Sequence, residues 1–449
     1  MSKSPRTFLN RQMAGMAIGA FAMLAMAVPA LSQEAPSKDE VFKLTTAIQV
    51  PGAALVSFDI SWVDPAVPTP NKGTYFLADR NNKAIDVVNT TNNSITQFPN
   101  PGFAGVNPAG NDFSGPDGVL TANNHTELWV GDSPGKVWVM NSSTGAIKTL
   151  PGGATNPIVV GGTTRADELC YDSQDNLIMI ASPGETPPFV TFISATTYKV
   201  VGKLVFDGGK ASGGLKATNG LEQCQWSPKT GKFYQNVPEV NGPGDDSQPG
   251  AVAVIDPKTM KVETSFPVDI DKCAGPQGMA IGPSNQILLG CNAASPDGHR
   301  NTVIINANSG AVLAIFPDLG GDDEVWFNDG DGHYFIPSCN TACRQGTGPE
   351  LLGVIDSTGF RLDQSVVLAT SLGAGTARRT HSVAADPDTN QVYVPIPASG
   401  SGGNAAICGQ APTNVGSPSA STGCIAVFAT TNEDHNRFAN ERGPDDHQE

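Results

Sequence analysis

The sequence predicts an all-β chain that folds as a seven-bladed β-propeller closed by an N-terminal strand. Three observations carry this prediction: short β-rich runs between turn residues, seven copies of one repeat at a period of about fifty residues, and a last copy that is one strand short. Glycine (50) and proline (35) are abundant, and no convincing amphipathic helix is present. Repeats of this length are typical of four-stranded propeller blades.

Each repeat opens with a short apolar strand, continues through an Asp/Asn/Gly/Pro turn, and returns in a second strand. The segment HSVAADPDTNQVYVPI at 381–396 is the clearest example. The seven copies begin at 59–79, 117–132, 167–182, 222–237, 277–291, 323–337 and 381–396. A third strand follows most of them, so we expect a single domain over residues 41–430 despite the length of the chain.

The two ends of the repeat region are complementary. The last copy finishes on its third strand, Cys424–Thr430, and the strand-like run Val41–Val50 precedes the first copy. We expect this N-terminal run to supply the missing outer strand, because an open ring would expose strand edges.

The first 32 residues resemble an export signal. A basic segment with Lys3, Arg6 and Arg11 precedes the apolar run Met13–Ala30, and small residues follow before Gln33. Cleavage predicts a periplasmic or secreted protein without a membrane span; an uncleaved membrane anchor is the alternative. The charged tail, 432–449, is expected to be disordered, and the mature chain is expected to be a monomer.

The chain is acidic, with a formal net charge of −16 that becomes −19 when residues 1–32 are removed. Such a field repels phosphate backbones, so nucleic acid is an unsuitable partner. Solubility alone also accounts for the acidity. A small-molecule substrate or a partner in the cell envelope is expected instead.

Eight cysteines lie beyond the signal segment, an even number that favours disulfides in an oxidising compartment. Cys339 with Cys343 and Cys408 with Cys424 would close short loops; Cys170 with Cys224 and Cys273 with Cys291 would complete the set. The sequence alone does not fix this connectivity. No C-x-x-C pair occurs, which argues against a structural zinc site.

A ring of polar residues emerges when the repeats are aligned on the end of their first strands. The position five residues earlier holds Asp59, Asp117, Asp167, Glu222, Gln277, Asp323 and His381. In a propeller, the first strands line the central channel, so these side chains would converge. Five carboxylates in a confined space raise one another's pKa and require compensation.

Two interpretations of the ring stay open. The first is a divalent cation bound by three or four of Asp59, Asp117, Asp167, Glu222, Gln277 and Asp323. Ca²⁺ is the leading expectation because oxygen donors suit it, and His381 extends the choice to Zn²⁺ or Mn²⁺. The second is solvation by channel water without any bound ion.

The repeat openings EQCQWSP, PQGMAIG and PDGVLTA resemble those of gluconolactonase/SMP-30-type propellers, and the repeat style resembles the NHL and YVTN families. In the lactonase family the metal ligands occupy the ring position. The resemblance therefore implies Asp59, Glu222 and Gln277 as ligands, with Asp117 and Asp167 as further candidates. That family has six blades and usually carries Asn where Glu222 stands and Asp where Gln277 stands.

Three further residues are catalytic candidates. Arg378, Arg379 and His381 lie together in GTARRTHS, before the last repeat. The arginines would clamp a substrate carboxylate and His381 would transfer a proton; alternatively, the arginines neutralise neighbouring carboxylates. No G-x-S-x-G, Walker or H-E-x-x-H motif is present, which argues against serine-hydrolase, nucleotide and zincin chemistry.

The sequence thus predicts an exported propeller that acts as a metal-dependent hydrolase of lactonase or esterase type at its central channel. The alternative is a non-catalytic periplasmic propeller that binds a protein, a cell-wall component or a metal ion. Long Gly/Ser/Pro-rich insertions at 239–250 and 398–423 fit such a recognition surface.

Overall fold

The computed structural model describes residues 42–68, 73–370, 379–398, 405–409 and 422–430. The chain divides into two compact units, Met1–Ser37 and Lys38–Glu449, and every described residue belongs to the second. The predicted export signal, 1–32, and the predicted disordered tail, 432–449, lie outside the described residues and stay predictions.

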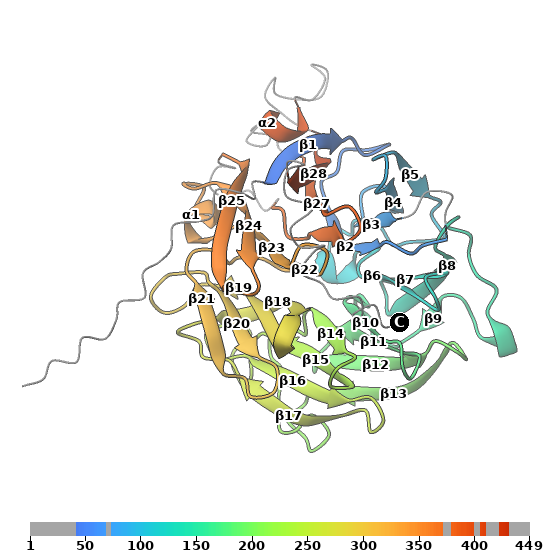
Figure 1. The fold of residues 1–449 in the computed structure, drawn as a ribbon. Coiled ribbons are helices and arrows are strands. Elements are labelled where there is room, and N and C mark those ends of the chain that lie inside the picture. The colour runs from blue at the N-terminus through green and yellow to red at the C-terminus, as the bar shows by residue number, and fades with distance from the viewer. Residues whose placement is uncertain (1–41, 69–72, 371–378, 399–404, 410–421, 431–449) are drawn as a thin grey trace, which may run out of the picture. The chain divides into compact units, whose positions relative to one another are not determined.

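The second unit consists of seven four-stranded antiparallel sheets arranged in a ring, which confirms the predicted seven-bladed propeller (Figure 1). Blades 1 to 4 comprise β2 (Phe58–Asp64), β3 (Thr74–Asp79), β4 (Ala84–Asn89) and β5 (Ile95–Phe98); β6 (Val119–Ala122), β7 (Glu127–Asp132), β8 (Lys136–Asn141) and β9 (Ile158–Val159); β10 (Leu169–Asp172), β11 (Leu177–Ser182), β12 (Phe189–Ser194) and β13 (Lys199–Val205); and β14 (Cys224–Ser227), β15 (Lys232–Val237), β16 (Ala251–Asp256) and β17 (Lys261–Pro267).

Blades 5 to 7 comprise β18 (Ala274–Gly282), β19 (Gln286–Ala293), β20 (Thr302–Asn306) and β21 (Val312–Phe316); β22 (Trp326–Asn328), β23 (His333–Ser338), β24 (Glu350–Asp356) and β25 (Arg361–Ala369); and β26 (Ala384–Asp386), β27 (Gln391–Ile396), β28 (Cys424–Thr430) and β1 (Phe42–Ile48). Short helices α1 (Thr341–Arg344) and α2 (Ala405–Cys408) and the 3₁₀ turns Asn111–Phe113, Pro151–Gly153 and Pro283–Asn285 lie in the connections.

The N-terminal strand closes the ring, as predicted. Strand β1 pairs antiparallel with β28, from Phe42 opposite Thr430 to Ile48 opposite Ile425. Blade 7 is therefore assembled from both ends of the repeat region, and its outer strand comes from before blade 1 (Figure 1).

The hairpin turns explain why the first strands end where they do. In blade 3 the Asp172 carboxylate accepts hydrogen bonds from the backbone N–H groups of Gln174 (2.9 Å) and Asp175 (3.0 Å). Asp386 makes the equivalent bond to Asp388 N at 2.9 Å. Such side-chain turns compete with strand continuation, so a terminal Asp stops the strand.

The hydrophobic core consists of seven clusters, one between each pair of neighbouring blades. The cluster between blades 7 and 1 joins Ile48 and Tyr393 to Tyr75 and Phe58. Each blade is thus apolar on both faces and buries both of them, which explains the continuous apolar runs in the middle strands.

Four disulfides reinforce the ring, and they are the four pairs that the sequence analysis considered. Cys170–Cys224 links the first strands of blades 3 and 4, and Cys273–Cys291 lies in blade 5. Cys339–Cys343 ties the residue after β23 to α1, and Cys408–Cys424 ties the last residue of α2 to the first residue of β28.

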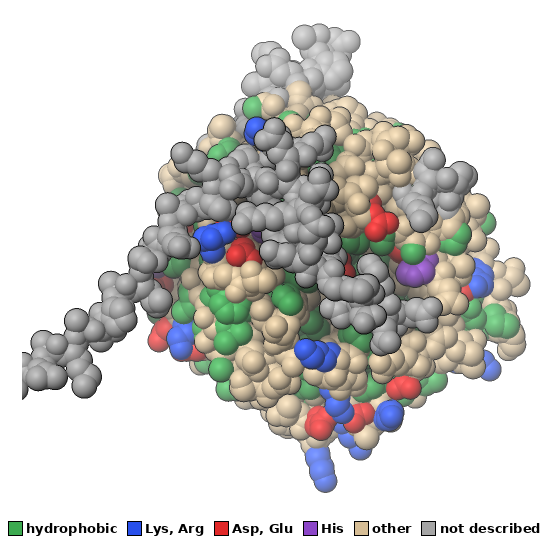
Figure 2. Space-filling model, in the orientation of Figure 1, with side chains coloured by type: hydrophobic (Ala, Val, Ile, Leu, Met, Phe, Trp, Pro, Cys, Tyr) green, Lys and Arg blue, Asp and Glu red, His purple; other side chains and the backbone are tan. Residues whose placement is uncertain are grey.

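Within the described residues, no helix is long and apolar enough to cross a bilayer. On the face drawn in Figure 2, basic and acidic side chains are scattered among uncharged ones, and the described residues there form no continuous basic stripe. The expected absence of a nucleic-acid partner stays a prediction.

Phe42→Ala tests the ring closure. Phe42 is 1 % exposed and packs edge-on against Phe335, with ring centroids 5.2 Å apart. We expect the free energy of unfolding, measured in urea, to fall by about 3–5 kcal/mol. Leu44→Ala on the same strand is the matched control, because Leu44 is 40 % exposed and its loss should change stability by less than about 0.5 kcal/mol. Equal effects of the two variants would contradict closure by β1.

Candidate functional site

The seven aligned ring residues occupy equivalent places in the structure. All seven innermost strands end at the aligned residue: Asp64, Ala122, Asp172, Ser227, Gly282, Asn328 and Asp386. These strands contact one another in sequence around the ring, from β2 through β6, β10, β14, β18 and β22 to β26. The residues five positions earlier therefore converge at one end of the innermost strands.

A buried arginine that the sequence analysis did not identify lies between two ring carboxylates. Arg80 follows directly after β3 and is 2 % exposed. Its Nη2 atom lies 2.5 Å from both Asp59 Oδ2 and Asp117 Oδ1, and its Nε donates to Asp117 Oδ1 at 3.0 Å. One guanidinium thus supplies part of the positive charge that the acidic ring requires.

Arg165 provides a second guanidinium from the segment before β10. Its Nη2 lies 2.9 Å from Asp167 Oδ2, and its Nη1 lies 3.7 Å from Asp59 Oδ2. Two arginines therefore face three carboxyl groups: Asp59, Asp117 and Asp167.

The protonation of these acids follows from that imbalance. Burial by itself would raise the pKa of Asp59, but Arg80, His381 and Arg165 together hold it well below its usual range. Burial raises the pKa of Asp167 to about 8 against the attraction of Arg165, and raises that of Asp117 strongly. Asp117 Oδ2 and Asp167 Oδ1 are buried without a hydrogen-bond partner, consistent with neutral carboxyl groups.

Four ring members line a pocket of about 460 Å³: Asp59, Gln277, Asp323 and His381. Arg80, Arg165, Arg344, Arg379, Asn292 and Asp322 also line it. The pocket combines carboxylates with guanidinium groups, a mixture suited to polar small molecules.

Within this pocket, Asp59, Asp323 and His381 form a compact set of potential metal ligands. One ligand atom from each lies within 4.8 Å of the others, and His381 Nε2 is 3.7 Å from Asp59 Oδ1. Asp59 and His381 come from blades 1 and 7, which meet where β1 closes the ring. Closure of the propeller therefore assembles this set.

The orientation of His381 leaves one nitrogen directed toward the acids. Its Nδ1 lies 2.9 Å from the Arg379 carbonyl, which only accepts, so Nδ1 carries the proton. The ring stacks on Phe58, with centroids 4.6 Å apart and planes at 1°. Nε2 is therefore directed at Asp59. Burial by itself would lower the pKa of His381, but Asp59 and Asp323 raise it, so a metal ion bound here would take the place of the Nε2 proton.

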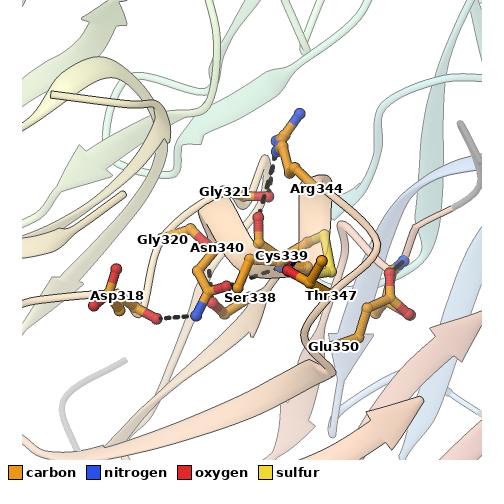
Figure 3. Close-up of a disulfide and its surroundings, with 12 residues drawn as sticks. Asp318, Gly320, Gly321, Ser338, Cys339, Asn340, Arg344, Thr347 and Glu350 are labelled. Carbon is orange, nitrogen blue, oxygen red and sulfur yellow. Dashed lines mark hydrogen bonds between the residues drawn. A yellow bond between two sulfur atoms is a disulfide. The ribbon is translucent and has the colours of Figure 1, made fainter. Parts of the chain in front are cut away.

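Two other groups of candidate ligands are less available. The oxygens of Asp59, Asp117 and Asp167 also lie within 4.8 Å of one another, but Arg80 and Arg165 already donate to them. Cys339, Cys343 and Glu350 form a third group, in which the two sulfurs are joined in a disulfide (Figure 3). A disulfide sulfur is not a thiolate and does not serve as a metal ligand of that kind.

The remaining predicted site residues lie around this centre. Glu222 is 9 % exposed; burial and the neighbouring Asp323 raise its pKa strongly, and Arg165 opposes them. Gln277 reaches the pocket while its backbone carbonyl accepts from Asn236 Nδ2 at 2.8 Å. Arg379 lines the pocket, and Arg378 lies outside the described residues.

A second polar layer, one residue after the ring, was also missed. It contains Glu168, Gln223, Glu324 and Ser382, all buried. The Glu324 carboxylate accepts from Ser382 Oγ and from Ser61 N, and the Gln223 side-chain oxygen accepts from Met279 N at 2.6 Å. Adjacent polar residues such as Asp167–Glu168 and Asp323–Glu324 were the available sequence signal. This layer joins neighbouring blades and fixes the backbone behind the ring.

We expect the free energy of unfolding to depend on pH because of the buried side chain of Glu350. Glu350 is 1 % exposed, its Oε1 accepts from Thr380 N at 3.0 Å, and its Oε2 has no partner. Burial raises its pKa to about 7. The folded state therefore binds this proton more tightly than the unfolded state, so stability is lost as pH rises from the unfolded pKa, about 4.3, to about 7.

Glu350→Gln should remove this loss. Between pH 5 and pH 8 the variant should gain stability relative to the parent protein by about 3 kcal/mol, as measured by urea unfolding at the two pH values. A parallel pH dependence of the two proteins would show that Glu350 is ionised in the folded state.

Comparison with known proteins supports the fold and leaves the family open. No family model and no curated protein matches the chain. Among 1570 matching chains of solved structures is one from the crystal structure of a mitotic checkpoint complex, with a TM-score of 0.52 and 14 % identity; the match covers 83 % of this chain and 96 % of that chain. A likeness at that identity shows the fold alone. The chain is a seven-bladed β-propeller, and the resemblance to gluconolactonase/SMP-30-type proteins stays a prediction.

Proposed function

We propose that this protein is an exported, metal-dependent hydrolase of lactonase or esterase type that acts in the pocket lined by Asp59, Asp323 and His381. One observation carries the proposal: two carboxylates and an imidazole, with ligand atoms within 4.8 Å of one another, face a pocket of about 460 Å³. Its four disulfides support an oxidising, extracytoplasmic location.

The donor set fits a divalent cation. Asp59 stays ionised because Arg80, His381 and Arg165 outweigh its burial and lower its pKa, and His381 Nε2 lies 3.7 Å from Asp59 Oδ1. Asp323 and the amide of Gln277 complete the set that faces the pocket. An imidazole nitrogen beside two carboxylates favours Zn²⁺ or Mn²⁺ over Ca²⁺, whose sites are built from six to eight oxygens.

The chemistry would be divided between the cation and the chain. A divalent cation polarises a carbonyl oxygen and makes a water molecule more acidic. Arg80 and Arg165 hold the Asp59 carboxylate in place by ion pairs. Asp322, buried and with neither carboxyl oxygen hydrogen-bonded, lines the same pocket and is our candidate for proton transfer. Asn292 would orient the substrate carbonyl group, and Arg379 would bind a carboxylate that the substrate carries.

The test is turnover with and without metal. The protein is stripped with chelator and assayed on a panel of lactones and esters after addition of Zn²⁺, Mn²⁺ or Ca²⁺. We expect hydrolysis of at least one substrate only after metal is restored. Equal turnover by the stripped protein would refute metal dependence. Bound metal without turnover of any substrate would favour the alternative function, a binding propeller of the cell envelope.

A further inference from the structure

Three arginines gather at the same pocket, two of them in its lining. Arg300 precedes β20, Arg344 is the last residue of α1, and Arg379 precedes β26. Arg344 and Arg379 line the pocket, and Asn292 connects Arg344 with Arg300: the Arg344 guanidinium donates to the Asn292 side-chain oxygen and Arg300 donates to the Asn292 carbonyl. Blades 5, 6 and 7 thus each contribute one arginine to the same region of the pocket.

The contacts of these arginines are with neutral groups. Arg344 Nη2 donates to the Gly321 carbonyl at 3.0 Å, and Nε donates to the Cys339 carbonyl at 3.3 Å, as Figure 3 shows. The Cys339–Cys343 disulfide ties the short helix that carries Arg344 to β23. The Arg344 side chain is therefore positioned by carbonyl groups, with its charge left for another partner.

No carboxylate oxygen among the described residues lies within 4.0 Å of Arg300, Arg344 or Arg379. Arg80 and Arg165, which line the same pocket, each have such a partner. Arg300 Nε is in addition buried without a hydrogen bond.

The mutual repulsion of the three arginines affects the pKa of Arg344. Burial lowers the pKa of Arg344, and the charges of Arg379 and Arg300 lower it further, to about 9. Half-buried guanidinium groups without a counter-ion are unfavourable unless an anion joins them.

We propose that Arg300, Arg344 and Arg379 form a subsite for an oxyanion group of the substrate, a carboxylate or a phosphate, next to the Asp59–Asp323–His381 set. Guanidinium groups bind such oxyanions through paired, charge-assisted hydrogen bonds. The inference that an anion binds here depends only on the three arginines. The substrate class that it implies, a lactone or ester that carries a free anionic group, rests on the proposed function.

The subsite is tested first without metal. Calorimetric titration of the chelator-stripped protein with succinate, and separately with inorganic phosphate, at constant ionic strength set by chloride, should show saturable binding of at least one of them. The tighter of the two identifies the oxyanion. Arg379→Gln should weaken this binding by about tenfold or more, because it removes one of the three guanidinium groups. We expect the variant to fold, because Arg379 lines the open pocket.

Arg344→Gln is the second variant, with its melting temperature checked because its side chain bonds three backbone and side-chain oxygens. Arg361→Gln, which removes the same charge from β25 outside the pocket, should leave anion affinity unchanged. No saturable binding by the parent protein, or equal loss in Arg361→Gln, would overturn the subsite.

Kinetic assays of the metal-loaded protein distinguish the anion subsite from the hydrolase activity. If the subsite serves the hydrolase, Arg379→Gln should raise KM for an anionic lactone and leave KM for its neutral analogue unchanged. Anion binding without any hydrolysis would retain the subsite and refute the hydrolase. Hydrolysis of neutral lactones without anion binding would refute the subsite and retain the hydrolase.

Discussion

Replacing Arg80 with Met should destabilise the propeller by about 3–5 kcal/mol, because it leaves buried acids without their shared cation. Arg80 is 2 % exposed and bonds both Asp59 and Asp117. Without it, two buried carboxyl groups from neighbouring blades face each other without the cation that they share. Urea unfolding at neutral pH measures the loss.

The double variant Arg80→Met/Asp117→Asn provides the control for this prediction. Asp117→Asn removes one of the acids and keeps its shape, so the double variant should be more stable than Arg80→Met alone. The two changes should therefore be non-additive, as expected for groups in direct contact. An Arg80→Met protein as stable as the parent within about 0.5 kcal/mol would show that the ring carboxyls do not depend on this guanidinium.

Asp323→Asn and His381→Gln should each lower kcat/KM for the best substrate by about a hundredfold or more, equivalent to at least about 2.7 kcal/mol of transition-state stabilisation. Each change removes one ligand of the proposed set and keeps the size of the side chain. Both variants should also require a higher metal concentration for half-maximal activity, which a purely structural role would not produce.

Asp86→Asn is the matched control for these two variants. Asp86 is fully buried on β4, in the outer part of blade 1, and bonds Gln97 at 2.7 Å. Burial and the neighbouring Asp79 already raise its pKa strongly, so the amide resembles the native neutral group. Its activity should equal that of the parent. Full activity of Asp323→Asn or His381→Gln would place the chemistry elsewhere in the ring.

The sequence sufficed for features that repeat with the fold. An Asp or Asn that ends a first strand, as at Asp172 and Asp386, bonds the turn that follows it, so a local signal marks the register of each blade. Once that register is known, the seven ring positions follow by counting. The closing strand was predictable for a similar reason, because blade 7 lacked a strand and the chain before blade 1 offered one.

The residues that decide the chemistry of the site do not repeat. Arg80 follows the second strand of blade 1, whereas Arg165 precedes the first strand of blade 3, and Arg344 ends a helix inserted into blade 6. An alignment of repeats compares equivalent positions, so it gives no signal for side chains that meet from different positions. The ring accordingly seemed to need an external cation for all its acids, although Arg80 and Arg165 supply part of that charge.

These arginines also divide the ring into two parts. Asp117 and Asp167 are engaged by guanidinium groups, and Asp323 and His381 face the pocket, with Asp59 common to both parts. That division depends on which way each side chain turns at the mouth of the channel, and the repeat pattern carries no information on it.

Elemental analysis of the protein, purified without chelator or nickel affinity resin, tests the central claim most directly. The proposal predicts about one equivalent of zinc or manganese per chain, lost in Asp323→Asn and retained in Asp86→Asn. A parent protein that contains no divalent metal and binds none of Zn²⁺, Mn²⁺ or Ca²⁺ on titration would contradict it, and would leave the ring as a structural network of acids and arginines.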